Sequence, residues 1–401
     1  METISSDLSD ALAAPPGVRE VTGWIVVTPP AALDVTPFVA RVVKAAVTQD
    51  VSGAVTRTAT AEIVSFDGLE YAVEEVGSDQ TFGSDDFGDG YFGGYATRVV
   101  RGLFMPLITT FVVWERFTLT DGTHEDVCHG VFYVTDVAYN DAGTQRTLAI
   151  SGMDAAGMLG KSRLVEPYQI AAGTNIGTAL SAWVTHHMPA AVVNVGTTAR
   201  TSTGAMYLVS DDTDPVTVAT QLCALAGWVF WVGRDGEFYA DVAPDDALYT
   251  GSPSAAYAFT PANVASYKLV PSGSDLVNTV IVTGSSGDAD TPVVGDASLA
   301  GAHPYSVASV GQVLAVHVTD DLMKDAVAAT AMADTVLRKK SAMVETLEVK
   351  SAAQVPHVDV RDIVSCASPN LDLEDPLWTV QGVTYEVGTA TPSFRLARVL
   401  T

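Results

Sequence analysis

One stretch of the sequence resembles a nucleotide-binding motif and ends in Gly160-Lys161-Ser162. In a P-loop, backbone N–H groups of a glycine-rich turn hold the phosphates, and the lysine reaches the same phosphates. That pattern needs a glycine at position 155, where this chain has Ala155. It also needs a parallel α/β sheet, whereas the surrounding residues have the composition of a β-barrel. We therefore expect no nucleotide site here.

A second group has side chains that can bind zinc. His124-Glu125 and His129 are similar to a zinc motif, but two histidine ligands on one helical face stand four residues apart. Here they stand five apart. Because Thr120–Thr123 has the residues of a turn between strands, we expect a solvated hairpin instead.

The acidic residues permit two further chemistries. Asp85, Asp86 and Asp89 are hard oxygen ligands for calcium, but the EF-hand spacing and its closing glutamate are absent. A solvated loop is the favoured interpretation, and whether it holds a cation is left open. No pair of acids is singled out for glycoside hydrolysis, and no Gly-x-Ser-x-Gly elbow occurs. We predict a non-enzymatic chain without a cofactor.

The charge balance argues against nucleic-acid binding. The 401 residues include 21 Lys and Arg against 47 Asp and Glu, a net charge of -26, whereas phosphate-binding surfaces need clustered cations. Only 17% of residues are charged and 48% are hydrophobic, while a soluble monomer carries about 25% charged residues. Two explanations of this composition stay open: apolar surface that neighbours cover in an assembly, or a generous hydrophobic core.

Neither a membrane span nor a disulfide framework is predicted. No run approaches the roughly 20 apolar residues that cross a bilayer. Cys128, Cys223 and Cys366 lie far apart and lack metal-ligand spacing, which is typical of synthesis in a reducing compartment. Residues 1–17 are an acidic N-terminal leader without the basic start of a signal peptide.

The elements that must position these residues are mainly strands. Residues 18–159 contain period-two runs rich in Val, Thr and Ala, which predict a first β-barrel-like domain. Residues 160–265 contain helices and a hairpin and predict a small α+β domain. Residues 266–401 return to strands and predict a second β-barrel-like domain with one long inserted helix. The fold class is therefore mainly β with an α+β insert.

Capping residues predict where the helices begin and end. Thr174 is expected to cap a helix, and Asp214-Pro215 starts another that Gly227 ends. We expect Thr319 to cap the long helix of about 20 residues. The cations Arg338-Lys339-Lys340 would then lie in its last turn, where they complement the helix dipole.

The order of these elements resembles that of the hub proteins at the tip of bacteriophage tails. The resemblance covers residues 18–400 and includes no catalytic signature. It is carried by the strand-to-helix segment Ala149–Leu159, the helix entry Ile170–Gly177, the helix at Asp214 with the following turn Gly233–Glu237, the re-entry strand Asn278–Gly284, the segment Pro356–Val364 and the closing strand Trp378–Val387.

This resemblance implies a structural subunit of the phage tail tip or baseplate hub. In that family, two barrel-like domains per subunit turn a homotrimer into a pseudo-sixfold ring, which joins the tail tube to the tip and lets DNA pass. The implied partners are neighbouring tail proteins: the distal tail ring, the tape measure, and tip or fibre proteins. The implied location is the virion, after synthesis in the host bacterial cytoplasm.

Two other functions stay open. The chain could be another tail component, such as a distal tail ring or a carbohydrate-binding module. Aromatic side chains would then stack on sugars, although core packing is their usual role. A β-rich hydrolase is the second alternative. The candidate sugar-stacking residues are Tyr91, Tyr95, Trp183, Trp228 and Trp231.

The segment Gly77–Tyr95 is glycine-rich, acidic and aromatic. Glycine permits unusual backbone angles, and the acids keep the segment solvated before assembly. Its aromatic side chains would bury apolar area against a neighbouring tail protein. We therefore predict an interface here, with a tolerated surface insertion as the alternative. The predicted interface residues are Phe82, Phe87, Tyr91, Phe92 and Tyr95.

Overall fold

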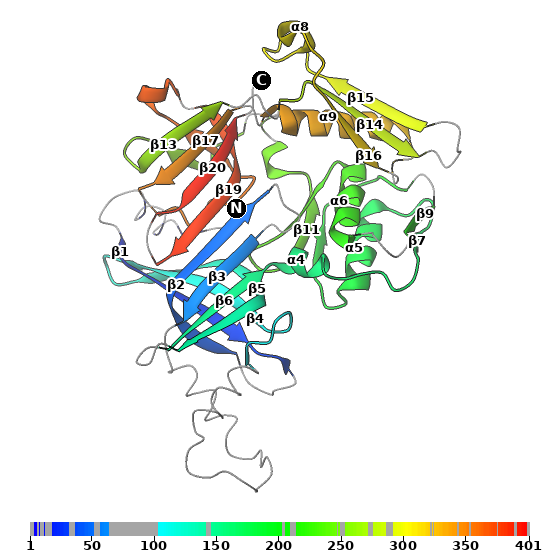
Figure 1. Cartoon of the computed structure of the whole chain (residues 1–401). Helices are drawn as coiled ribbons and strands as arrows, with labels where there is room; N and C mark the ends of the chain where they lie inside the picture. Colours follow the sequence, from blue (N-terminus) through cyan, green and yellow to red (C-terminus); the bar gives the residue numbers. More distant parts are fainter. Residues whose placement is uncertain are drawn as a thin grey trace.

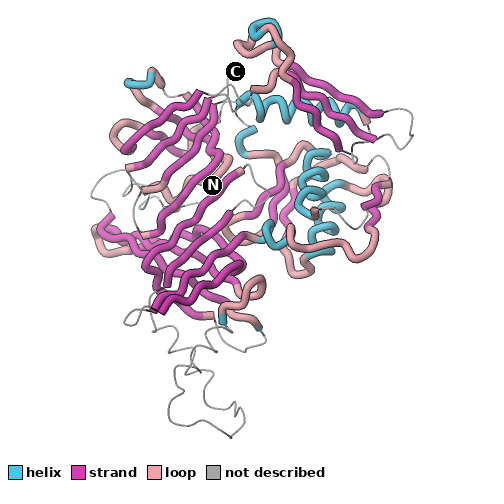
Figure 2. Tube along the Cα trace, in the orientation of Figure 1, coloured by secondary structure: helices cyan, strands magenta, loops and turns pink. Residues whose placement is uncertain are grey.

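Two β units joined edge to edge, with two smaller α+β units beside them, make up the computed structural model (Figure 1). The structure describes residues 4–5, 8, 12, 18–31, 37–51, 57–63, 103–141, 146–202, 205–208, 214–246, 248, 253–271, 276–285, 292–320, 323, 325–342, 345–352, 354–374, 376–388 and 391–398. Strands predominate over helices in the described structure taken as a whole, and the helices are concentrated in the two α+β units (Figure 2). The predicted fold class is confirmed.

The first β unit consists of six antiparallel strands. Their order is β1-β4-β5-β6-β3-β2, and β2 pairs again with β1, so the pairings form a circuit. Alternate side chains of β4 and β3 point into this circuit and are buried, which is the period-two pattern of a half-buried sheet. The strands are β1 (Val18–Thr28), β2 (Phe38–Asp50), β3 (Arg57–Ile63), β4 (Thr110–Leu119), β5 (His124–Asp141) and β6 (Arg146–Met153).

The second β unit continues the same sheet. The first part of β2 pairs with β1, while its last residues pair with β19, so the strand order runs on as β2-β19-β20-β17-β13. β18 pairs with β19 and β12. Buried side chains of both β units form one hydrophobic cluster. The strands are β12 (Tyr257–Phe259), β13 (Val264–Pro271), β17 (Glu345–Ser351), β18 (Ile363–Cys366), β19 (Leu377–Val387) and β20 (Ser393–Arg398).

The first α+β unit has a hydrophobic cluster of its own, centred on helices α5 and α6. These helices lie against each other and against the sheet β10-β11-β8 (Figure 1). A short helix, α4, connects the unit to β6. The elements are α4 (Ala155–Leu159), β7 (Tyr168–Ile170), α5 (Ile176–His187), β8 (Val193–Val195), β9 (Met206–Leu208), α6 (Pro215–Ala226), β10 (Val229–Val232), β11 (Phe238–Asp241) and the 3-10 turn η2 (Pro244–Asp246).

The second α+β unit is a three-stranded sheet with the long helix α9 packed on one face. The helix lies so close that a Cβ added at Gly295 would meet Thr330 N at 2.2 Å. Its elements are β14 (Thr279–Ser285), β15 (Pro292–Ser298), α8 (Val307–Val310), β16 (Ala315–Asp320) and α9 (Ala326–Ala342); the 3-10 turn η3 (Pro369–Leu371) follows later in the chain. The four-part division into domains stays a prediction, and its boundary at residue 266 falls inside β13.

Two predicted helix caps are wrong, and one is confirmed. Asn175, not Thr174, caps α5, because the Asn175 side chain accepts a hydrogen bond from Thr178 N. Thr319 lies in β16, where it pairs with Thr283. The long helix begins only at Ala326, and Asp325 accepts a hydrogen bond from Ala328 N at 2.8 Å. Helix α6 has the predicted start at Asp214-Pro215 and ends at Gly227, with φ 76°.

Candidate functional site, a buried polar junction

Among the described residues, buried charged and polar side chains gather where β2 leaves the strand circuit and pairs with β19. They come from both β units and from the first α+β unit, so they connect three parts of the chain. We call this set the junction. Its members are Gln49, Arg57, Glu115, His129, Arg234, Asp359 and Tyr385.

Arg57 enters the junction from the first β unit. It is the first residue of β3 and occupies one of the inward positions of that alternating strand, so its side chain is only 3% exposed. Its backbone N–H donates to Asp154 Oδ2 at 2.8 Å, and Asp154 also caps α4. Its Nη1 donates to the carbonyl of Val232 at 3.0 Å, which ties β3 to β10.

Arg234 enters from the tight turn between β10 and β11. Gly236 in this turn has φ +82°, and a Cβ there would meet Val131 Cβ at 2.9 Å, so the turn approaches β5 as only glycine permits. The Arg234 guanidinium donates to the carbonyl of Pro356 at 2.7 Å and to that of Val358 at 3.1 Å. One side chain therefore fixes the loop before β18 against the α+β unit.

Asp359 is the anion between the two arginines. Arg57 Nη2 pairs with Asp359 Oδ2, and Arg234 Nε lies 3.2 Å from the same oxygen. The Gln49 amide, oriented with its nitrogen toward Asp359 and its oxygen toward Arg57 Nε, hydrogen-bonds to both. Every polar group of this cluster is thus satisfied, as a buried ionic group requires.

Electrostatics distinguish Asp359 from the neighbouring Asp362. Burial alone would raise the pKa of Asp359, but Arg57 and Arg234 outweigh burial and hold that pKa below its ordinary value. At Asp362, burial prevails and raises the pKa. Asp362 Oδ2 accepts the backbone N–H of Asp359 at 2.8 Å, so it orients the loop that carries Asp359.

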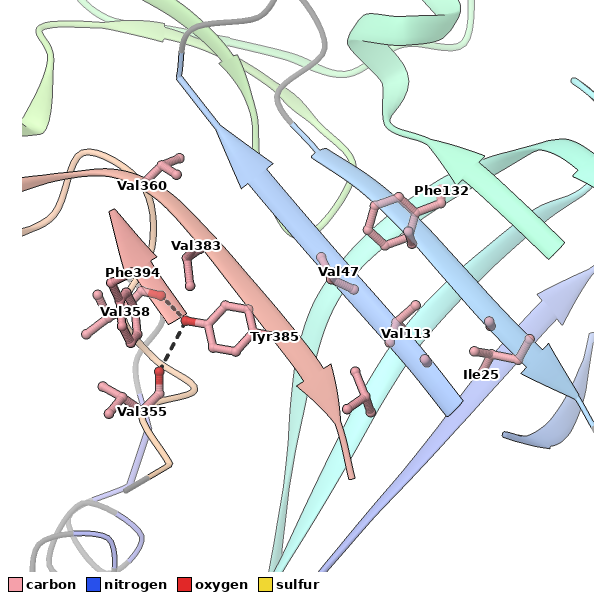
Figure 3. Packing of buried hydrophobic residues seen from close by; sticks show 14 of the residues in the cluster. Ile25, Val47, Val113, Phe132, Val355, Val358, Val360, Val383, Tyr385 and Phe394 are labelled. Carbon is pink, nitrogen blue, oxygen red and sulfur yellow. Dashed lines mark hydrogen bonds between the residues drawn. The ribbon is translucent and has the colours of Figure 1, made fainter. Parts of the chain in front are cut away.

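Tyr385 of β19 stands between the arginine cluster and a second polar pair. Its hydroxyl donates to the carbonyls of Val355, at 3.1 Å, and Val358 (Figure 3). The Arg234 guanidinium carbon lies 5.7 Å from the centre of the Tyr385 ring, within cation–π range. The His129 ring lies 4.7 Å away on another side. Burial raises the pKa of Tyr385, so its hydroxyl stays a donor.

The expected solvated hairpin is wrong for His129. The turn at residues 120–123 exists and is exposed, but His129 lies nine residues past its start with no exposed surface. His129 Nε2 is 2.9 Å from Glu115 Oε2, and Glu115 Oε1 accepts the backbone N–H of Gly388 at 2.9 Å. The pair therefore joins β4 and β5 to the end of β19, and His124 and Glu125 take no part in it.

The end of β19 enters between β1 and β2 at a glycine. A Cβ added at Gly23 would meet Val387 Cγ1 at 2.4 Å, so a larger residue there would displace the strand. The end of β19 thus lies where β1 and β2 diverge beyond their paired residues, and the junction lies beside this point.

The junction offers little space for a substrate. A cavity lined by Glu115, Gln354 and Tyr385 measures about 10 Å³, room for about one water molecule. Ligand pockets usually span about 300–1,000 Å³. The arginines and Asp359 are already paired with protein groups. The arrangement therefore holds the units of the chain together.

The other sequence candidates lie elsewhere. Gly160-Lys161-Ser162 follows the C-terminus of α4, not a helix N-terminus that could hold phosphate, and Ser162 Oγ lies 2.8 Å from His187 Nδ1. No group of three metal-ligating side chains occurs within the described ranges. None of the helices among the described residues is long and apolar enough to span a membrane. Asp85, Asp86 and Asp89 fall outside the described ranges.

The aromatic residues considered for sugar stacking or for an interface are not members of the junction. Trp183 and Trp228 are buried in the α+β core, so they are not exposed for sugar stacking. Trp231 is half-buried and lies parallel to Tyr239, with ring centres 5.6 Å apart. The predicted interface residues Phe82, Phe87, Tyr91, Phe92 and Tyr95 lie outside the described residues.

Sequence reasoning missed the junction, although one signal was present. Glu115 occupies an inward position of an alternating strand, between Val113 and Phe117, which are fully buried. A charged residue on an apolar strand face requires a buried partner. The identity of that partner depended on strand pairing, which the sequence did not fix.

Comparisons with known proteins agree with the architecture. No family model and no curated protein sequence matches the chain. Among solved structures, it is similar to the 43 kDa tail protein of prophage MuSo2 from Shewanella oneidensis, with 12% identity, a TM-score of 0.59, and 94% of this chain and 98% of that chain covered. A tail protein from Neisseria meningitidis gives 12% identity and a TM-score of 0.61 over 94% and 97% of the two chains.

A third similar structure is the prophage tail protein gp18 from Listeria monocytogenes. It is 9% identical, with a TM-score of 0.53, and 94% of this chain and 95% of that chain are covered. Because identity is so low, these likenesses establish the fold alone. They extend over nearly the whole length of each protein, so the chain has the overall fold of these bacteriophage tail proteins.

Proposed function

We propose that the chain is a structural subunit of a phage tail tip or baseplate hub. The observation that carries the proposal is a fold shared with three tail proteins over 94% of this chain and 95% or more of each of them. A likeness of that extent includes both β units and both α+β units. It therefore supports a role for the whole chain, beyond that of one common module.

The proposed assembly is a homotrimeric ring with pseudo-sixfold symmetry. Each subunit supplies two β units, and the pairing of β2 with β19 joins them through hydrogen bonds. The buried junction fixes their relative orientation, because ionic groups without solvent tolerate little displacement. A subunit with that rigidity suits a ring that joins the tail tube to the tip and lets DNA pass. The proposed neighbours are the distal tail ring, the tape measure, and tip or fibre proteins.

We also propose that the subunit has no catalytic activity and resides in the virion after synthesis in the host cytoplasm. The support is that Arg57, Arg234 and Asp359 are engaged with protein groups: Arg57 with the carbonyl of Val232, Arg234 with that of Pro356, and both arginines with Asp359. A zymogram with bacterial cell walls tests for hydrolysis. A glycan array tests the carbohydrate-binding alternative, for which the half-buried pair Trp231 and Tyr239 is the remaining aromatic candidate.

The interface formed by Phe82, Phe87, Tyr91, Phe92 and Tyr95 remains part of the proposal. Deletion of residues 78–94 should lower incorporation of the chain into particles, since the aromatic side chains would no longer bury area against a neighbour. Normal yield of infectious particles with the shortened chain would contradict the interface.

The decisive experiment for the ring is a reconstruction of the particle that contains the chain. We expect three copies at the tail tip, arranged around a central channel. Light scattering of the purified chain supplies the oligomeric mass in solution. Six copies at the tip, or a ring without threefold symmetry, would overturn the proposal.

A further inference from the structure

Two aromatic side chains and an amide form a row on one face of the sheet β10-β11-β8. The register pairs Trp231 with Tyr239, and Tyr239 with Asn194, so the row crosses all three strands. Since neighbouring strands lie about 4.8 Å apart, the row is about 10 Å long. The Trp231 and Tyr239 side chains are half-buried, and Asn194 is exposed. We call this row the aromatic strip.

The aromatic strip lies on the face of the sheet opposite the helices. Phe230, Val232 and Phe238 pack into the hydrophobic cluster of the first α+β unit together with residues of α5 and α6. Because successive side chains of a strand point to opposite faces, Trp231 and Tyr239 point away from these helices. Their rings are nearly parallel, with an angle of 17° between the ring planes. The strip therefore presents part of its aromatic surface to solvent.

Two carboxylates hold the polar groups of the aromatic strip in place. Asp235 Oδ2 accepts a hydrogen bond from the Tyr239 hydroxyl, and Glu237 Oε2 accepts one from Asn194 Nδ2 at 2.7 Å. The hydrogen bond to Asp235, followed by burial, raises the pKa of Tyr239 to about 12, so its hydroxyl stays a donor. An ionised carboxylate has about four acceptor sites, so both carboxylates have capacity for hydrogen bonds from a ligand.

The turn that carries both carboxylates is fixed from its other side. Arg234 in this turn points into the junction, where its guanidinium donates to the carbonyl of Pro356 at 2.7 Å. A Cβ added at Gly233 would meet Tyr239 Cε2 at 2.6 Å, so the backbone of the turn passes directly beside the Tyr239 ring. A ligand would meet groups that are already positioned, which lowers the entropy lost on binding.

We infer that the aromatic strip binds a neutral glycan chain, an activity beyond the proposed structural role. One side of a sugar ring consists of C–H groups that pack on an aromatic ring, while its hydroxyl groups donate hydrogen bonds from the edge. Trp231 and Tyr239 supply the aromatic surface, and Asp235 and Glu237 supply acceptors. Because these two charged groups are both anions, an anionic glycan is repelled. The ligand is therefore a neutral polysaccharide with hydroxyl or acetamido donors.

A second aromatic pair differs in the groups around it. Trp24 and Trp114 are half-buried and parallel on β1 and β4, with ring centres 6.4 Å apart. The Arg116 guanidinium carbon lies 4.9 Å from the centre of the Trp24 ring, and Arg116 also pairs with Asp126 through two contacts of 2.7 and 2.8 Å. A cation thus covers aromatic surface at this pair, and its carboxylate is held by that cation. Trp114 is therefore a matched control for Trp231.

Isothermal titration calorimetry of the purified chain tests the inference. The probes are chitohexaose and cellohexaose, which are neutral, and polygalacturonate, which is anionic. We expect binding of at least one neutral hexamer and no binding of polygalacturonate. Trp231→Ala should weaken binding of the hexamer by about tenfold or more, because it removes stacking surface. Trp114→Ala should bind the hexamer as the wild type does.

Glu237→Gln provides a second variant that keeps the shape of the side chain. It should weaken binding by about threefold or more, because a hydrogen bond to a carboxylate is stronger than one to an amide. This variant decides the matter if Trp231→Ala does not fold.

Four results would overturn the inference. They are no binding of either neutral hexamer, binding of polygalacturonate as tight as that of the hexamers, unchanged binding by the folded variants at positions 231 and 237, and an equal loss in Trp114→Ala. None of them bears on the proposed hub, because the particle reconstruction tests that role separately.

Discussion

Ion pairs connect the two β units at two places, and these places differ in their surroundings. At the junction, the Arg57 and Asp359 side chains are 3% and 15% exposed. On the outer surface of the sheet, the Arg395 and Asp50 side chains are 46% and 36% exposed, although they also bridge the two units through β20 and β2. The chemical groups are alike, so burial is the variable that separates the two places.

Burial changes what the loss of one partner costs. An exposed ion that loses its partner is solvated by water, and salt already screens the pair. A buried ion that loses its partner keeps the cost of its own desolvation without compensation. The comparison predicts that the junction determines how strongly the β units are held together, while the exposed pair of Arg395 and Asp50 contributes little.

The largest expected effect follows removal of the anion at the junction. Asp359→Ala leaves Arg57 and Arg234 buried beside one another without a counter-charge, so it should lower the free energy of unfolding by about 3 to 5 kcal/mol. Denaturant titration monitored by tryptophan fluorescence measures the change. A loss below about 1 kcal/mol, the range of exposed pairs, would remove the distinction between the two places.

A pH effect should arise from His357, beside the junction. Burial, followed by the charge of Arg234, lowers the pKa of His357 to about 4. In the unfolded chain its pKa is about 6.5, so the unfolded state takes up a proton first as the pH falls. The contribution of His357 to the free energy of unfolding is therefore fully present above about pH 6.5. It is lost as the pH falls from about 6.5 to about 4, and the loss is at most about 3 kcal/mol.

His357→Gln isolates that contribution. The variant should lose less stability than the wild type between pH 7 and pH 4.5, because glutamine does not titrate. The free energy of unfolding of both proteins is measured at each pH in the same buffer. Since carboxylates titrate in both, equal losses in the two proteins would contradict the assignment to His357.

Tyr385→Phe should have a smaller effect. The change leaves the carbonyls of Val355 and Val358 without their tyrosine donor, a loss of about 1 to 3 kcal/mol for buried groups. Tyr207→Phe is the matched control, because Tyr207 is 68% exposed and its hydroxyl only accepts a hydrogen bond from Gln169. In denaturant titrations, Tyr385→Phe should lower the free energy of unfolding more than Tyr207→Phe does. Equal losses would contradict the idea that burial makes the Tyr385 hydrogen bonds costly to remove.

Local elements of the fold were predictable from the sequence. The capping signals at Asp214-Pro215 and Gly227 correctly place the start and the end of α6, and the closing strand Trp378–Val387 differs from β19 by one residue at its start. The cap of the long helix was not predictable in the same way. Thr319 has a capping side chain, but strand pairing with β14 prevails over that preference.

The junction was beyond sequence reasoning because its partners are remote. Arg57 and Asp359 are 302 positions apart, and Arg234 and Asp359 are 125 apart. Their proximity depends on the pairing of β2 with β19, which joins strands from opposite ends of the chain. Only the inward position of Glu115 indicated a buried polar group, and it did not identify Tyr385 or Gly388 as neighbours.

The smallest effect should follow Arg395→Ala, which removes the exposed ion pair between the β units. Its pair with Asp50 has two contacts of 2.8 Å but is exposed, so its removal should cost only about 0.2 to 1 kcal/mol. The difference between variant and wild type should shrink further in 1 M salt, because the screening length falls from about 10 Å to about 3 Å. The Asp359→Ala loss should persist in the same salt, since buried charges are screened far less. Unfolding titrations of both variants at low and high salt provide the measurement. If Arg395→Ala costs as much as Asp359→Ala and resists salt equally, the exposed pair holds the units together as firmly as the junction, and burial does not explain the contrast.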